Sequence, residues 1–172
     1  MGRSKMTKSE DDLKAAFAGE SQANRKYLAF AKKADQDGFP NVAKLFRAAA
    51  AAETVHAHGH LRKLGGIKST VENLKEAVSG EHYELSTMYP EFIEDAKADG
   101  NKGAEMSFNF ALAAEKVHHI LYEKALESVE SGKDGDAEDI YVCSVCGMTF
   151  EGEAPDKCPV CGASKDKIEK ID

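Results

Sequence analysis

The chain has 172 residues, enough for one sizeable core and a small second module. Its formal net charge is −7, and it has no basic cluster of the kind that binds phosphate backbones, so we expect no nucleic-acid partner. No run approaches the ~20 apolar residues of a membrane span, and residues 1–12 lack the apolar centre of a signal peptide. We therefore expect a cytoplasmic protein that does not bind membranes.

The first ~130 residues are rich in Ala, Leu, Glu and Lys and predict four long helices. We expect the first helix at about 9–37, where Gly38 ends it. The second should start near Pro40 and end at Gly65 and Gly66, because proline suits a first turn and glycine a helix end. The third should run from Ser69 or Thr70 to about residue 100, and the fourth over about 101–130. Pro90 lies inside the third helix and should kink it or require a local adjustment.

A second module follows the helices. Residues 131–139 are polar, acidic and contain glycine, as is typical of a linker. All four cysteines come after it, in two Cys-x-x-Cys pairs that each precede a glycine: Cys143 with Cys146, and Cys158 with Cys161. Four clustered thiols predict a metal site, which a module this short needs in order to fold. The spacing alone leaves open a structural zinc ribbon or a redox-active single iron. We predict a helical domain at 1–132, a linker at 133–139 and a metal module at 140–172.

The helical region contains a repeat. The sequence AAETVH at 51–56 recurs as AAEKVH at 113–118, and Gly19-Glu20 corresponds to Gly80-Glu81. The offset is 61 or 62 residues throughout, so the first and last helix pairs read as two copies of one hairpin.

Each copy places one glutamate on its first helix and a Glu-x-x-His on its second, and residues three apart share a helix face. The third helix adds a seventh residue, Glu84, three positions after Glu81. Carboxylates facing an apolar interior are costly unless a cation neutralises them. One such motif alone is typical of a helix surface, but two in register favour a dinuclear site of the ferritin-like kind, holding iron or manganese, with zinc as an alternative. The predicted ligands are Glu20, Glu53, His56, Glu81, Glu84, Glu115 and His118. The remaining histidines, His58, His60, His82 and His119, should lie at the surface or behind the ligands.

Several longer motifs resemble the rubrerythrin family. GES with Tyr27, AE-x-VH, GEHYELSTMYPEF and AAEKVHHILY resemble its ferritin-like domain, and Y-x-C-x-x-C-G with CP-x-CG resembles its C-terminal rubredoxin-like domain. The resemblance covers nearly the whole chain. It implies a mainly α fold, in which a ferritin-like four-helix bundle is followed by a small rubredoxin-like module with a four-cysteine metal site.

The resemblance also implies a function: a non-haem diiron peroxidase that reduces hydrogen peroxide to water in oxidative-stress defence. Two irons would lie in the bundle and one in the four-cysteine site, where recombinant protein could carry zinc. The iron of the four-cysteine site would relay electrons from an external donor such as a rubredoxin or an NAD(P)H-linked reductase. The alternatives are a ferroxidase or iron-binding protein and, less favoured by the ligand set, a non-catalytic metal-stabilised interaction protein.

The resemblance assigns roles to individual side chains. Glu53 and Glu115 would bridge the two irons, Glu20 would bind one of them, and Glu81 with His118 would bind the other. Glu84 and His56 would exchange as ligands when the redox state changes. Tyr27 and Tyr89 would hydrogen-bond the carboxylates, although either could equally be a core residue.

The connector between the second and third helices is short. Ferritin-like bundles hold these two helices parallel, and here their arms beyond the ligands total roughly 30 Å along the axis. A connector over 65–70 reaches at most about 25 Å. We therefore expect a domain-swapped homodimer with shared metal sites, or else unwinding of the helix ends that lengthens the connector.

Overall fold

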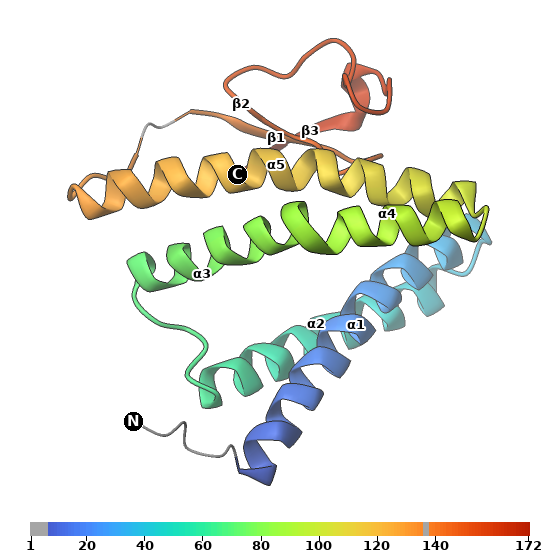
Figure 1. Cartoon of the computed structure of the whole chain (residues 1–172). Helices are drawn as coiled ribbons and strands as arrows, with labels where there is room; N and C mark the ends of the chain where they lie inside the picture. Colours follow the sequence, from blue (N-terminus) through green and yellow to red (C-terminus); the bar gives the residue numbers. More distant parts are fainter. Residues whose placement is uncertain (1–6, 136–137) are drawn as a thin grey trace. The chain divides into compact units, whose positions relative to one another are not determined.

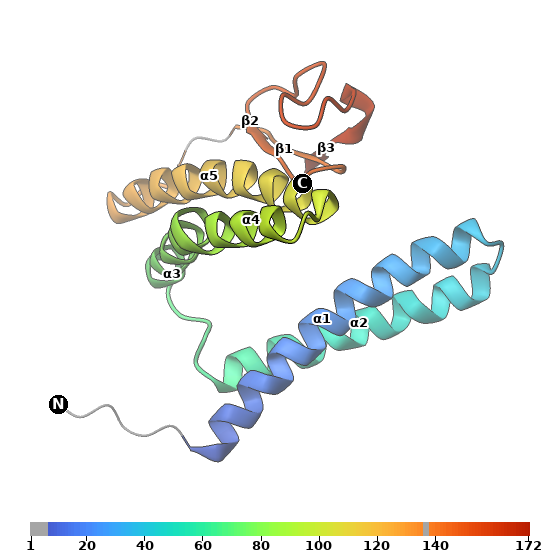
Figure 2. The same ribbon diagram turned by 45° about the vertical axis from the view of Figure 1, so that its right-hand side comes forward.

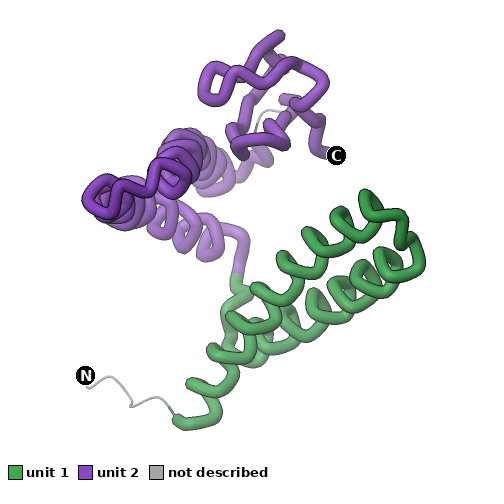
Figure 3. Tube along the Cα trace, turned by 90° about the vertical axis from the view of Figure 1, so that its right-hand side faces the viewer, with its two compact units in different colours: residues 1–68 green, residues 69–172 purple. Residues whose placement is uncertain are grey.

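The computed structural model of the chain describes residues 7–135 and 138–172. The chain divides into two compact units, residues 1–68 and 69–172 (Figure 3). Residues 136–137 of the predicted linker and residues 1–6 of the predicted first domain lie outside the described residues.

The first unit is a helical hairpin of α1 (Lys8–Gln36) and α2 (Pro40–Lys63), which run side by side in opposite directions (Figures 1 and 2). Thr7 begins α1 with a capping box: its hydroxyl accepts the backbone N–H of Glu10, whose carboxylate accepts the N–H of Thr7 at 2.7 Å. Gly38 ends α1 with a φ of +81°, a conformation that glycine adopts without strain.

The hairpin packs through small side chains. Its buried apolar residues, within the part of the chain that is described, are all alanines, including Ala43 and Ala50 at 0% and 1% exposure. Alanines let two helices approach closely, but they bury little apolar area. Larger apolar side chains of the hairpin are exposed, among them Leu45 at 69% and Val55 at 65%. The hairpin therefore offers more apolar surface than its own core uses.

The second unit begins with α3 (Thr70–Tyr83), which a capping box of Ser69 and Glu72 initiates. A π-helical turn, η1 (Glu84–Met88), joins α3 to α4 (Tyr89–Ala98), and α5 (Lys102–Glu130) returns alongside them (Figure 1). Pro90 lies two residues after the π turn, and a proline within a helix removes a hydrogen bond and crowds the preceding turn. The π turn is the local adjustment that the sequence predicts at this proline.

The cysteine module is a small antiparallel sheet with two loops. Its strands β1 (Ile140–Cys143), β2 (Thr149–Glu151) and β3 (Ile168–Ile171) lie in the order β2-β1-β3, and a short 3₁₀ turn, η2 (Lys165–Lys167), precedes β3. Each Cys-x-x-Cys loop closes with a backbone hydrogen bond from its glycine, Gly147 to Cys143 at 2.8 Å and Gly162 to Cys158 at 2.9 Å. Both glycines have positive φ, at +80° and +75°.

Every predicted helix is present and begins and ends within about two residues of its expected limits. The described helix ends show no unwinding around the connector, because α2 is regular to Lys63 and α3 starts at Thr70. None of the helices, within the residues described, has the length and apolar composition that crossing a membrane requires.

Candidate metal centres

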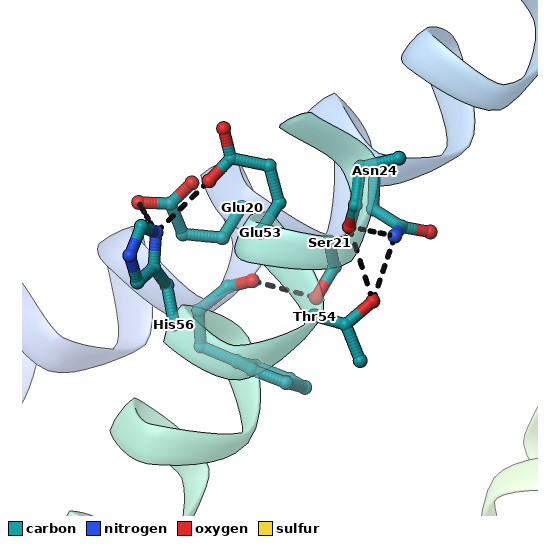
Figure 4. A network of polar contacts seen from close by, with 8 residues as sticks. Glu20, Ser21, Asn24, Glu53, Thr54 and His56 are labelled. Carbon is teal, nitrogen blue, oxygen red and sulfur yellow. Dashed lines mark hydrogen bonds and ion pairs between the residues drawn. The ribbon is translucent and has the colours of Figure 1, made fainter. Parts of the chain in front are cut away.

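The first unit gathers the α1–α2 ligand group, which consists of Glu20, Glu53 and His56 (Figure 4). Glu20 comes from α1, and the other two residues lie one turn apart on α2. The His56 Nδ1 atom lies 3.0 Å from Glu53 Oε2 and 3.9 Å from Glu20 Oε1. One ligand atom from each residue lies within 4.8 Å of the other two, so the hairpin brings these predicted ligands together.

A buried polar contact fixes the two helices beside these ligands. The Asn24 Nδ2 group donates to the backbone carbonyl of Ala50 at 2.7 Å and to Thr54 Oγ1 at 2.8 Å (Figure 4). Asn24 is one turn beyond Glu20, and Thr54 directly follows Glu53, so this contact sets the height of one ligand relative to the other. The sequence gives no sign of this contact, because an asparagine in a long polar helix carries no signal of burial.

The charges of the α1–α2 ligand group point to a shared cation. Contact with Glu53 raises the pKa of Glu20, and burial adds to the shift. The same contact lowers the pKa of Glu53, as does its hydrogen bond to His56. Two carboxylates this close repel one another when both are charged, and a divalent cation between them would remove that repulsion.

The second unit gathers the α3–α5 ligand group: Glu81 from α3, with Glu115 and His118 from α5. The His118 Nδ1 atom lies 2.7 Å from Glu115 Oε2 and 3.8 Å from Glu81 Oε2. Burial, reinforced by the neighbouring Glu115, raises the pKa of Glu81 to about 8. Its Oε2 atom is buried and has no hydrogen-bond partner among the described residues. A cation between these three groups would satisfy that oxygen and remove the repulsion.

Glu84 and Tyr89 lie near the α3–α5 ligand group. Burial raises the pKa of Glu84, and the charge of Glu115 adds to the shift. Burial also raises the pKa of Tyr89, and the charges of Glu115 and Glu84 add to it. Glu84 nevertheless stands outside the compact set of three ligand atoms. Glu84 opens the π turn, a type of helical irregularity that is frequent at functional sites.

The remaining predicted side chains occupy varied surroundings. Tyr27 packs its ring near Phe30 and Phe46, with centroids 6.3 and 6.1 Å away. His119 is half-buried, its ring centroid lies 5.4 Å from that of His82, and its Nδ1 atom is buried without a hydrogen-bond partner among the described residues. His58 is exposed and His60 is half-buried.

The four cysteines form one compact group, the four-cysteine site. The sulfur of Cys143 lies 3.6 Å from that of Cys161, and the sulfur of Cys146 lies 3.5 Å from that of Cys158. These separations are far longer than a disulfide bond of about 2.05 Å. They are close to the ~3.8 Å edge of a tetrahedron with metal–sulfur bonds of about 2.3 Å. The sulfur positions therefore fit a single tetrahedral metal.

Backbone amides support thiolate character at Cys158. Burial acts to raise the pKa of Cys158, but hydrogen bonds from the backbone amides of Cys161 and Val160, together with the neighbouring thiols, lower it to about 7, whereas burial raises the pKa of Cys146 to about 12. Donors of this kind stabilise metal-bound sulfur and tune the potential of an iron there.

Comparison with known proteins decides the family. Residues 11–126 match the family described as Rubrerythrin, and residues 141–169 match the rubredoxin-like domain of rubrerythrin. The chain belongs to the rubrerythrin family. It is 36% identical to Rubrerythrin-2 of Clostridium acetobutylicum, with 92% of this chain and 94% of that protein covered. It is 38% identical to nigerythrin of Nitratidesulfovibrio vulgaris, with 91% and 83% covered.

Solved structures of nigerythrin agree with this assignment. A mixed-valence form shares 35% identity at a TM-score of 0.55, covering 99% of this chain and 90% of that chain. A form described as fully reduced and all ferrous shares 34% identity at a TM-score of 0.56, with the same coverage. The family match and the ligand groups confirm three predictions: a mainly α, rubrerythrin-type fold ending in a four-cysteine module, an oxidoreductase family, and iron as the cofactor of both kinds of site.

Proposed function

We propose that this rubrerythrin is a peroxidase that reduces hydrogen peroxide to water in oxidative-stress defence. One observation carries the proposal: a single chain holds two Glu-Glu-His groups together with a four-cysteine site. When bound, a ferrous pair would supply the two electrons that break the O–O bond, and the iron of the four-cysteine site would return electrons one at a time. The chain's own residues hold these metals and set the charge around them.

We propose Glu53 and Glu115 as the ligands shared between two metals, because each has a histidine one turn away on the same helix face. Glu20 and Glu81 then bind from the opposite helix of each group. His56, with a side chain 55% exposed, has the freedom to change its position as a ligand. Glu84 lies at a π turn and outside the compact ligand set, which supports its proposed role as the ligand that exchanges with His56.

The structure gives different evidence for the proposed roles of the two tyrosines, Tyr89 and Tyr27. The effect of three carboxylates on the pKa of Tyr89 supports its proposed role as a hydrogen-bond donor to the α3–α5 ligand group. Tyr27 contacts aromatic rings, which favours a packing role over the proposed contact with a carboxylate.

We further propose a domain-swapped homodimer in which each dinuclear site joins the α1–α2 ligand group of one chain to the α3–α5 ligand group of the other. The connector supports it: regular helix on both sides leaves only six residues, Leu64 to Ser69, to link α2 with α3. The exposed apolar side chains of the hairpin, such as Leu45 and Val55, supply surface for a partner.

Other assignments follow from the same reading. We propose a ferritin-like domain at 1–132, a linker at 133–139 and a rubredoxin-like domain at 140–172. An external donor, a rubredoxin or an NAD(P)H-linked reductase, would deliver electrons to the four-cysteine site. Four free thiols clustered for metal binding favour a reducing compartment such as the cytoplasm. The alternative function, a ferroxidase or iron-binding protein, does not explain the four-cysteine module, because iron storage does not require rapid re-reduction of the dinuclear site.

Anaerobic stopped-flow mixing tests the proposal. The fully reduced, iron-loaded protein is mixed with hydrogen peroxide in one experiment and with dioxygen in another. We expect peroxide to oxidise the dinuclear site much faster than dioxygen does. Faster oxidation by dioxygen would instead favour the ferroxidase.

A further inference from the structure

A hydrogen bond joins the cysteine module to a predicted iron ligand within the second unit. The Nε2 atom of His118 on α5 lies 2.8 Å from Oγ1 of Thr149 on β2. Thr149 is 7% exposed and the side chain of His118 is 30% exposed, so the threonine end of this contact is shielded from water. Beside it, Lys124 of α5 and Glu151 of β2 form an ion pair at 2.6 Å, which holds the same strand against the same helix.

The surroundings of Thr149 and His118 allow one direction for this hydrogen bond when a cation is bound. The hydroxyl has one hydrogen, and it donates to the backbone carbonyl of Gly147 at 3.4 Å, an oxygen that can only accept. With a cation on Nδ1, the neutral ring of His118 carries its proton on Nε2, and Nε2 then donates to Thr149 Oγ1. The other ring nitrogen of His118, Nδ1, faces Glu115 and Glu81 and is left to bind a cation.

The same contact connects the two kinds of metal site through bonds. Gly147 directly follows Cys146, one of the four thiol ligands. A continuous path thus runs from Cys146 through the Gly147 carbonyl and the Thr149 hydroxyl to the imidazole of His118. Every link in this path belongs to one chain, and every link is covalent or a hydrogen bond.

We propose that Thr149 is a positioning residue: its hydroxyl accepts from His118 Nε2, orients that ring with Nδ1 toward the carboxylates, and connects the four-cysteine site to that ligand. In the transfer that this serves, the iron of the four-cysteine site is oxidised by one electron and the iron at the Glu/His site is reduced by one. The transfer rests on the proposed function, whereas the tautomer and the contact do not. The sequence carries no signal for the residue, because threonine is common in strands.

The first test uses zinc-loaded full-length protein with ¹⁵N-labelled histidine, so that neither iron chemistry nor peroxide is involved. Long-range ¹H–¹⁵N spectra should show His118 with metal on Nδ1 and a proton on Nε2. Replacing the hydroxyl in Thr149→Val should speed exchange of that proton with water by about 10-fold, as expected for the loss of one net hydrogen bond. Thr149→Ser keeps a hydroxyl and should restore slow exchange.

Glu151→Gln is the matched control, because it removes the neighbouring ion pair and keeps the hydroxyl. Exchange that is unchanged in Thr149→Val, or equally fast in Glu151→Gln, would overturn the proposal. A proton found on Nδ1 would overturn it as well.

The second test follows internal electron transfer in the iron-loaded protein after one addition of peroxide. Oxidation of the iron in the four-cysteine site gives a visible absorbance that reports the transfer. We expect it to slow by about 10- to 100-fold in Thr149→Val and to recover in Thr149→Ser, the range typical for residues that support a metal ligand. A wild-type rate in Thr149→Val would refute the bonded path. Failure of peroxide to react even with the wild-type protein would instead refute the proposed function and leave the zinc experiment to decide on Thr149.

Discussion

Complementation between two inactive chains tests the domain swap. One chain carries Glu53→Gln, which disables the α1–α2 ligand group, and the other carries Glu115→Gln, which disables the α3–α5 ligand group. Neither variant alone can form a complete dinuclear site. In a swapped heterodimer, however, one site receives both damaged groups and the other receives both intact groups. Random pairing makes about half of the dimers heterodimers, so co-expression should restore about one quarter of the wild-type sites.

The lengths of the elements give the physical basis of this prediction. From Glu53 to Lys63 and from Thr70 to Glu81 the helices rise about 15 and 16 Å at 1.5 Å per residue. A connector that returned within one bundle would have to cover that combined length along the bundle axis and a helix spacing of about 10 Å across it. The straight-line distance is then roughly 33 Å. The seven links from Lys63 to Thr70 reach at most about 25 Å when fully extended. The shortfall favours pairing between chains.

Lengthening the connector is the control. Twenty Gly/Ser residues inserted between Gly66 and Ile67 raise its typical end-to-end distance to about 29 Å and its limit far beyond the required span. Complementation should then fall towards zero, while the insertion in an otherwise wild-type chain keeps complete sites. Restored sites are counted by iron content and by the peroxide-oxidised absorbance of the dinuclear centre. Absence of restoration with the natural connector, although heterodimers form, would refute the swap.

Two further predictions concern charge and electron entry. Because the pKa of Glu81 is about 8 in the folded protein against an ordinary 4.5, the metal-free protein should lose stability as pH rises from 5 to 8, by roughly 3 kcal/mol. Denaturant unfolding should show a smaller decrease of the free energy of unfolding with pH in Glu81→Gln. A free energy of unfolding that rises between pH 5 and 8 in the natural chain would contradict this prediction. Cys158→Ser should abolish steady-state turnover with an external donor yet leave one peroxide oxidation of the dinuclear site intact. Turnover at the wild-type rate would exclude the four-cysteine site as the entry point.

The sequence predicts the helices well because their limits depend on local chemistry. Gly38, Pro40 and Ser69 end or begin helices through their own backbone and capping preferences, which need no knowledge of the rest of the fold. The ligand groups are equally accessible, because the Glu-x-x-His spacing places both side chains on one helix face and the repeat shows it twice.

Side-chain contacts between different helices and strands could not be predicted from the sequence. Asn24 pairs with Thr54 across the hairpin, and Thr149 pairs with His118 between a strand and a helix. Neither contact has a period or a motif, since each depends on how two elements happen to pack. Pro90 illustrates an intermediate case: it signals an adjustment in the helix, but the π turn that results depends on the packing of its neighbours.

The most direct test of the account is the reaction of the fully reduced protein with hydrogen peroxide under anaerobic stopped flow, followed at the dinuclear site and at the iron of the four-cysteine site together. The account predicts that the dinuclear site is oxidised first and much faster than by dioxygen, and that the iron of the four-cysteine site is oxidised afterwards as it returns electrons. A dinuclear site that reacts with dioxygen at least as fast as with peroxide would contradict the account, as would a four-cysteine iron that stays reduced throughout.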